Sequence, residues 1–250
     1  MIEPLEPRIA PAAAVTFFEA DGDKITVKTS AGTTDQLEAA LGILNGDVNI
    51  GTVELDFLKT SALAAAFKGT SVSVTGSGDG VDAMKINAWD NGSTDSIDLG
   101  KVKIKGKLVF IDAGDNDTFT PAVASIDVTN WGKEPGVAVA VDSAIHGDIP
   151  KITVKNDFSG YIHSVDFNGT SNYTALGTSI DSFSANIIGG ENGNDVGHIQ
   201  VSNIGKLTVK DTFNGPAPTS ATNSGLIEAQ SLHVINIKRM ESGARIVLST

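Results

Sequence analysis

Apolar and polar residues alternate along much of the chain, and one alternating line is written twice. The segments "DIPKITVKNDFSG" (148–160) and "NIGKLTVKDTFNG" (203–215) share seven of thirteen residues at a separation of 55. Their apolar residues recur at matching places, with Lys and Thr between them. This pattern is typical of strands that bury one face.

Two further segments extend the repeat. "DLGKVKIKGKL" (98–108) starts 50 residues before the first line, and "SLHVINIKRMESG" (231–243) starts 28 residues after the second, which indicates a period of 25 to 28. A single repeat of this length cannot bury its inward face until another repeat covers it. The sequence therefore predicts a mainly β fold, a parallel β-solenoid (β-helix), in which Ile152 and Leu207 stack in register with one repeat between them. A β-sandwich is the alternative, because it also uses alternating strands, but it predicts no repeated line at a fixed interval.

The first 70 residues have a helical pattern in two places. "DQLEAALGIL" (35–44) predicts a helix in which Asp35 and Glu38 form the capping arrangement. "TSALAAAFKG" (60–69) predicts a second helix that begins at Thr60 or Ser61 and stops at Gly69. An amphipathic element at this place would cover the open interior of the first repeat. The predicted parts are an N-terminal segment and candidate assembly strand at 1–20, a mixed α/β capping region at 21–70 and the solenoid at 71–250.

Composition narrows the classes of partner. The 250 residues include 30 acidic and 18 basic side chains, so the net charge is −12. This balance argues against nucleic acid, which is bound by clustered Lys and Arg. The chain has no cysteine, which excludes disulfides and thiolate-bound metal. It also has no apolar run of the length that a membrane-spanning helix needs, so we expect no membrane span.

Two segments carry a resemblance to a known kind of protein. "IEPLEPRIA" (2–10) is similar to the LEPR-type motif near the amino terminus of large, secreted, repeat-rich proteins of planctomycete and verrucomicrobial bacteria. "TSALAAAFKGTSVSVTGSGDG" (60–80) and "IGKLTVKDTFNG" (204–215) resemble the Gly-rich β-repeat regions of the same proteins. The resemblance implies an extracellular or cell-surface repeat protein and implies no chemistry.

Acidic loops are the candidate metal sites. In "DAGDNDTF" (112–119), the carboxylates of Asp112, Asp115 and Asp117 can converge on calcium, a cation that prefers oxygen ligands. A solvated turn is the alternative. "GSGDGVD" (76–82) is a weaker candidate of the same kind. The sequence assigns no catalytic residue and no residue that binds an organic cofactor.

The function that these patterns favour is structural. Stacked repeats expose strand edges at both ends, and the β-prone segments "AAAVTFF" (12–18) and "ARIVLST" (244–250) can exchange strands with a neighbouring copy. We therefore expect a self-assembling fibre, sheet or coat subunit that is not an enzyme, with its own copies and surface glycans as partners. The alternative is a glycan-binding or glycan-cleaving β-helix protein, a polysaccharide lyase or hydrolase. It would use paired carboxylates such as Asp142 with Asp148 or Asp181 with Asp166.

Overall fold

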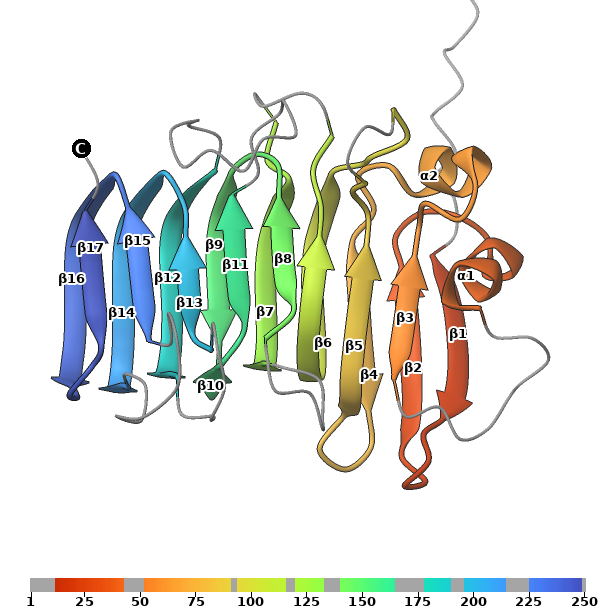
Figure 1. The fold of residues 1–250 in the computed structure, drawn as a ribbon. Helices are drawn as coiled ribbons and strands as arrows, with labels where there is room; N and C mark the ends of the chain where they lie inside the picture. Colours follow the sequence, from red (N-terminus) through yellow and green to blue (C-terminus); the bar gives the residue numbers. More distant parts are fainter. Residues whose placement is uncertain are drawn as a thin grey trace, which may run out of the picture.

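A computed structural model describes residues 12–42, 52–90, 94–115, 120–132, 140–164, 178–189, 196–214 and 225–248. Most of these residues lie in strands, and two short helices occur in the N-terminal part (Figure 1). The strands are β1 (Ala13–Phe18), β2 (Lys24–Thr29), β3 (Val53–Asp56), β4 (Val72–Gly76), β5 (Val81–Asn87), β6 (Leu99–Asp112), β7 (Val123–Trp131), β8 (Asp142–Ile145), β9 (Ile149–Val154), β10 (Asp157–Phe158), β11 (Tyr161–Ser164), β12 (Ser179–Ile188), β13 (His198–Gln200), β14 (Asn203–Phe213), β15 (Leu226–Ala229), β16 (Ser231–Met240) and β17 (Arg245–Leu248). The helices are α1 (Thr34–Leu41) and α2 (Ser61–Phe67).

The strands form two sheets of unequal size. The larger has 12 strands and follows the path β1-β2-β4-β6-β7-β10-β12-β14-β16, with β3, β5 and β9 paired off this path. The smaller has five strands in the order β17-β15-β13-β11-β8, all parallel. In Figure 1 the smaller sheet lies in front of the C-terminal strands of the larger one. Apolar side chains from both sheets, among them Ile162, Ile199 and Leu207, belong to one buried core.

The predicted parallel β-solenoid is wrong. The pairings instead give a large sheet, in which β7, β9, β12 and β10 close a ring of four parallel strands, and a second parallel sheet beside it. The ring arises because β9 and β10 both lie between β7 and β12 and each pairs with both. The N-terminal strands also differ from a parallel solenoid, because the pairings of β1 with β2 and of β2 with β4 are antiparallel. A β-sandwich does not describe the chain either, because the remaining pairings between named strands are parallel.

The predicted register of the repeated lines is confirmed. Phe183 on β12 is the partner of Ile152 on β9 and of Leu207 on β14, and both pairings are parallel. The two similar lines are therefore two strands apart, with β12 between them. Their residues are alike because they occupy equivalent places in one continuous sheet.

Four columns of inward apolar side chains hold the C-terminal part of the large sheet together. The strand β12 shows the spacing, since Ile180, Phe183, Ala185 and Ile188 are its buried apolar residues. The same spacing of three, two and three residues occurs on β7. The columns across β7, β12, β14 and β16 are Val123-Ile180-Ile204-Leu232, Ile126-Phe183-Leu207-Ile235, Val128-Ala185-Val209-Ile237 and Trp131-Ile188-Phe213-Met240. Edge-to-face contacts of Phe158 with Trp131 at 5.5 Å and with Phe183 at 5.1 Å add aromatic packing inside this stack.

A bend in β6 explains why the N-terminal part has no separate second sheet. The first half of β6 pairs with β4, through Val102 and Ile104, and its second half pairs with β5 from Gly106 onward. Gly106 has φ +122°, a value that L side chains rarely adopt, and it faces Val81 closely. The single strand β6 thereby pairs with β4 before the bend and with β5 after it, so both belong to one continuous sheet.

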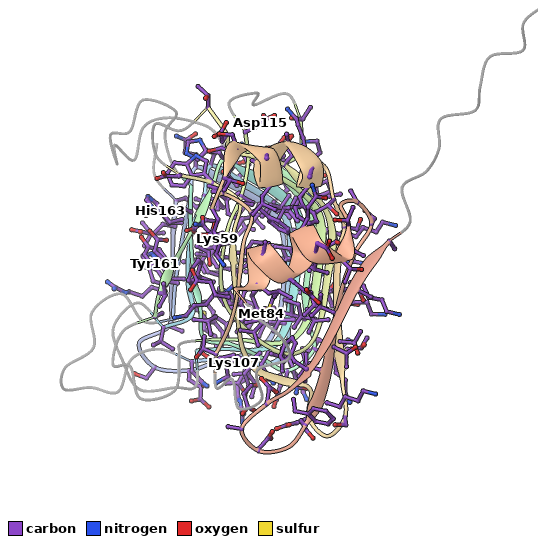
Figure 2. The ribbon with its side chains drawn as sticks, turned by 90° about the vertical axis from the view of Figure 1, so that its right-hand side faces the viewer. Lys59, Met84, Lys107, Asp115, Tyr161 and His163 are labelled. Carbon is purple, nitrogen blue, oxygen red and sulfur yellow. The ribbon has the colours of Figure 1, made fainter. Side chains whose placement is uncertain are left out.

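The two predicted helices are present and cover the N-terminal end of the core, as Figure 2 shows from that side. The α1 helix buries Leu37, Ala40 and Leu41, while α2 buries Leu63, Ala64 and Phe67. The predicted cap of α2 is confirmed at Thr60, but that of α1 is wrong, because Thr33 and Gln36 form the capping box in place of Asp35 and Glu38. The Lys59 ammonium closes the other end of α1 by donating to the carbonyls of Ala39 and Ala40, at 3.2 and 2.8 Å.

The structure describes only part of the predicted N-terminal segment at 1–20. Residues 1–11 lie outside the described ranges, whereas Ala13–Phe18 form β1, which pairs with β2 of the same chain. Neither helix in the described ranges is long and apolar enough to cross a membrane.

Replacing Gly106 with alanine should destabilise the fold strongly. A Cβ atom there would lie 2.2 Å from the carbonyl oxygen of Val81, and the alanine would have to adopt the positive φ of +122° that Gly106 has. We expect a loss of about 2 to 5 kcal/mol in the free energy of unfolding, measured by urea titration. The control is Gly69→Ala, where φ is +72° but nothing lies within 4 Å. It should cost only about 1 to 2 kcal/mol, and equal losses for both variants would contradict the bend as a tight packing point.

Candidate functional site

The C-terminal end of the stack leaves its inward side chains only partly covered. We call this surface the open end and define it by the inward residues of the two last strands: Leu232, Ile235, Ile237 and Met240 of β16, and Ile246 and Leu248 of β17. Ile235, Met240 and Leu248 are 50%, 47% and 55% exposed, whereas Leu207, the neighbour of Ile235 on β14, is fully buried. Covering the exposed half of one such side chain would contribute about 1 kcal/mol.

The backbone of the open end is also unpaired on one side. Among the described strands, β16 pairs only with β14 and β17 pairs only with β15. Each therefore presents a row of N–H and C=O groups to its outer edge, which is a template for a further strand. The open end thus combines apolar side chains with free strand edges.

The opposite end of the stack buries its inward side chains, although β1 also pairs with only one of the described strands, β2. The inward residues of β1 are Ala13, Val15 and Phe17, which are 2%, 6% and 3% exposed. The helix α1 packs against β1 and β3, and its residues Leu37 and Ala40 are fully buried. The two ends of the stack therefore differ in how far their inward side chains are exposed.

Charged side chains border the open end without covering it. Arg239 donates to the hydroxyl of Thr212 at 2.6 Å and lies 3.7 Å from a carboxylate oxygen of Glu241. Lys238 and Arg239 both approach Asp211, at 3.8 and 3.9 Å. These exposed ion pairs contribute little stability, so their main effect is to fix charged groups beside the apolar surface.

A row of mostly polar side chains runs across β3, β5 and β6 and continues over the smaller sheet. Strand register places Asp56, Asn87 and Asp112 side by side on β3, β5 and β6. The row continues through Ala144, His163, Gln200 and Glu228 on β8, β11, β13 and β15. Parallel strands in register bring equivalent positions together, so residues far apart in sequence form this row.

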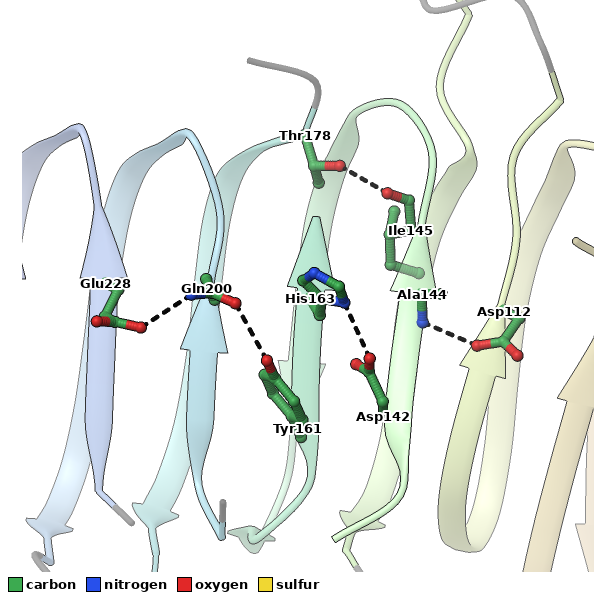
Figure 3. A network of polar contacts seen from close by, with 9 residues as sticks. All are labelled: Asp112, Asp142, Ala144, Ile145, Tyr161, His163, Thr178, Gln200 and Glu228. Atoms are coloured by element: carbon green, nitrogen blue, oxygen red, sulfur yellow. Dashed lines mark hydrogen bonds and ion pairs between the residues drawn. The ribbon is translucent and has the colours of Figure 1, made fainter. Parts of the chain in front are cut away.

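Hydrogen bonds join the members of the row (Figure 3). Gln200 accepts from the Tyr161 hydroxyl at 3.1 Å and donates to Glu228 at 3.0 Å. His163 Nδ1 lies 2.9 Å from an oxygen of Asp142. The Tyr161 ring stacks on the ring of His198 at 4.5 Å and on that of His163 at 5.9 Å. Each of these three rings therefore already stacks on another.

Asp112 is the most perturbed carboxyl of the row. Burial raises its pKa from 3.8 to about 7, the hydrogen bond from the Ala144 backbone N–H opposes this shift, and the charge of Asp142 adds to it. That hydrogen bond is 2.8 Å long. Part of the Asp112 population is consequently protonated near neutral pH.

The predicted calcium site is only partly described. Asp112 belongs to the polar row, Asp115 forms an ion pair with Lys68 at 3.0 Å, and Asp117 lies outside the described residues. Convergence of these three carboxylates stays a prediction.

The structure separates one of the carboxylate pairs considered for glycan cleavage. Asp142 begins β8, whereas Asp148 precedes β9 of the other sheet and accepts a hydrogen bond from the Ser179 N–H. Asp166, the proposed partner of Asp181, is outside the described ranges.

Carboxylates of the described residues do converge where the β1–β2 turn meets Asp79 and Asp82, the two acids of the "GSGDGVD" candidate. Oxygens of Glu19, Asp21 and Asp82 lie within 4.8 Å of one another, as do those of Asp21, Asp23 and Asp79. Burial, opposed by a hydrogen bond from the Asp82 N–H and reinforced by the neighbouring acids, raises the pKa of Glu19 to about 7. A hard cation such as Ca²⁺ could be held here. Sequence reasoning missed Glu19 because 63 residues separate it from Asp82.

Replacing Asp112 with asparagine should change the pH dependence of stability. The folded state holds a proton that the unfolded chain has lost above pH 4, so Asp112 lowers the free energy of unfolding as pH rises from about 4 to about 7. In urea titrations across this range, the free energy of unfolding of the variant should increase relative to that of the unmodified protein, by up to about 1.4 kcal/mol for each unit by which pH rises. Asp35→Asn, on the exposed first turn of α1, is the control. Parallel pH profiles for the unmodified chain and the Asp112 variant would contradict the assignment.

The comparisons with known proteins add no relative. No family model matches the chain, and neither a curated protein nor a solved structure shows significant similarity to it.

Proposed function

We propose that this chain is a structural protein that associates with itself through the open end. The observation that carries the proposal is the contrast between the two ends. On β16 the inward residues Ile235 and Met240 are about half exposed and Leu232 and Ile237 are partly buried, whereas the inward residues of β1 are almost fully buried. An exposed apolar end with free strand edges is costly in a soluble molecule unless something adds to it.

Strand addition is the mode of association that this surface favours. A strand from a second molecule would satisfy the backbone groups of β16 and cover its inward side chains, as β16 itself does for β14. The product would be a structural assembly, in which the joined pair is the first unit and a fibre, sheet or coat is the extended form. An extracellular or cell-surface location belongs to the same proposal and is supported by the resemblance of the N-terminal motif and the β-repeats.

The glycan-binding or glycan-cleaving alternative has weaker support. Sugars are commonly bound on open aromatic faces, yet the Tyr161 ring already stacks on the rings of His198 and His163. Asp142, a candidate carboxylate for such chemistry, is held by His163. The polar row is more consistent with side chains that lock neighbouring strands of the small sheet.

Replacing Ile235 with lysine should weaken self-association. The charged side chain would lie among the inward residues of the open end, where a bound strand would strip its water. We expect the dissociation constant to rise at least tenfold, about 1.4 kcal/mol, by analytical ultracentrifugation. Phe18→Lys is the matched control, because Phe18 is a 45% exposed apolar residue at the other end of the stack.

Each outcome of this comparison has a clear meaning. An effect of the Ile235 variant alone supports association through the open end. Equal effects at both positions would show that β1 takes part and would contradict the stated surface. If the unmodified protein is monomeric at high micromolar concentration, self-association is excluded as its function.

A further inference from the structure

The inward positions of β16 have a symmetric spacing. Leu232, Ile235, Ile237 and Met240 continue the four apolar columns of the large sheet and are separated by three, two and three residues. This spacing is the same when β16 is read in either direction, and its centre is Asn236. A strand with this pattern can therefore match an antiparallel copy of itself.

We propose that the partner of the open end is the open end of a second copy, with the two β16 strands antiparallel about a two-fold axis at Asn236. This inference rests on the proposed function and specifies its geometry. Directly opposed residues of an antiparallel pair point to the same face. With Asn236 opposite Asn236, Leu232 lies opposite Met240 and Ile235 lies opposite Ile237, so all four inward columns continue into the second molecule.

The register is well determined by these side chains. Moving the axis by one residue, to Ile235, would place Leu232 opposite Lys238 and Ile237 opposite His233. Inward apolar residues would then share a face with polar ones, which disfavours that pairing. Only the axis at Asn236 joins each of the four inward residues to another inward residue.

Charge does not oppose this pairing. Lys238 lies opposite Val234, and the two copies of Lys238 are four residues apart along the pair, about 13 Å. This exceeds the Debye length of about 8 Å at physiological ionic strength, so their repulsion is largely screened. Arg239 lies opposite His233, and its guanidinium is already engaged by Thr212 and Glu241.

The N-terminal end offers no equivalent match. The inward residues of β1, Ala13, Val15 and Phe17, are spaced by two and are already buried, with α1 packed against the strand. A head-to-tail contact would oppose unlike patterns of inward residues. The two-fold contact uses the same surface on both molecules, so it closes at a dimer, whereas a head-to-tail contact would give an open polymer.

Disulfide trapping tests this geometry, since the chain has no cysteine of its own. In Asn236→Cys the two Cα atoms at the axis would be about 5 Å apart, within reach of a disulfide. In the control Lys238→Cys they would be about 13 Å apart, beyond its reach. Both positions are exposed on the same edge strand, so both variants should fold. After mild oxidation, we expect a covalent dimer from the first variant and at least tenfold less from the second.

Light scattering of the unmodified protein separates the possible failures. A dimer mass together with selective trapping at Asn236 supports the two-fold pairing. Association without selective trapping, or a mass above that of a dimer, overturns this pairing and leaves self-association standing. A monomer at high micromolar concentration overturns both the pairing and the proposed function.

Discussion

The packing of inward apolar side chains into four columns is the interaction on which the large sheet depends. Each column residue is buried only while a strand lies on either side of it, as the change from Leu207 to the half-exposed Ile235 shows. Burying one such side chain contributes about 1.5 to 3 kcal/mol, so the stack gains with every added strand. Because an end strand has a neighbouring strand on one side only, its inward side chains stay exposed unless another element covers them.

The two ends of the stack differ in how their inward side chains are covered. At the N-terminal end, the pairing turns antiparallel and α1 and α2 place Leu37 and Phe67 over the core. Thr33, Thr60 and Lys59 satisfy the helix termini, which lets these short helices persist at the surface. At the C-terminal end no helix among the described residues covers the columns beyond β16. On the smaller sheet, hydrogen bonds along the polar row join strands β11, β13 and β15 in register.

The sequence predicted local features and register better than architecture. Repeated lines revealed that Ile152 and Leu207 stack, because identical environments select identical residues, and Thr60 and Gly69 marked the second helix. The solenoid was wrong because the bend at Gly106 and the antiparallel pairing of β1 leave no trace in the spacing of the repeats. The polar row was missed because its members come from separate strands and have no common motif. The symmetric spacing of β16 was visible in the sequence, but only strand pairing shows which side chains face inward.

Hydrogen exchange at two protein concentrations tests most directly whether the open end is the surface of association. The backbone N–H groups on the outer edge of β16 have no partner among the described strands, so they should exchange fast in dilute solution. The account predicts that peptides covering 231–240 become protected as concentration rises, while those covering 13–18 do not change. Unchanged exchange at 231–240 in a sample that has associated, or new protection at 13–18 alone, would contradict it.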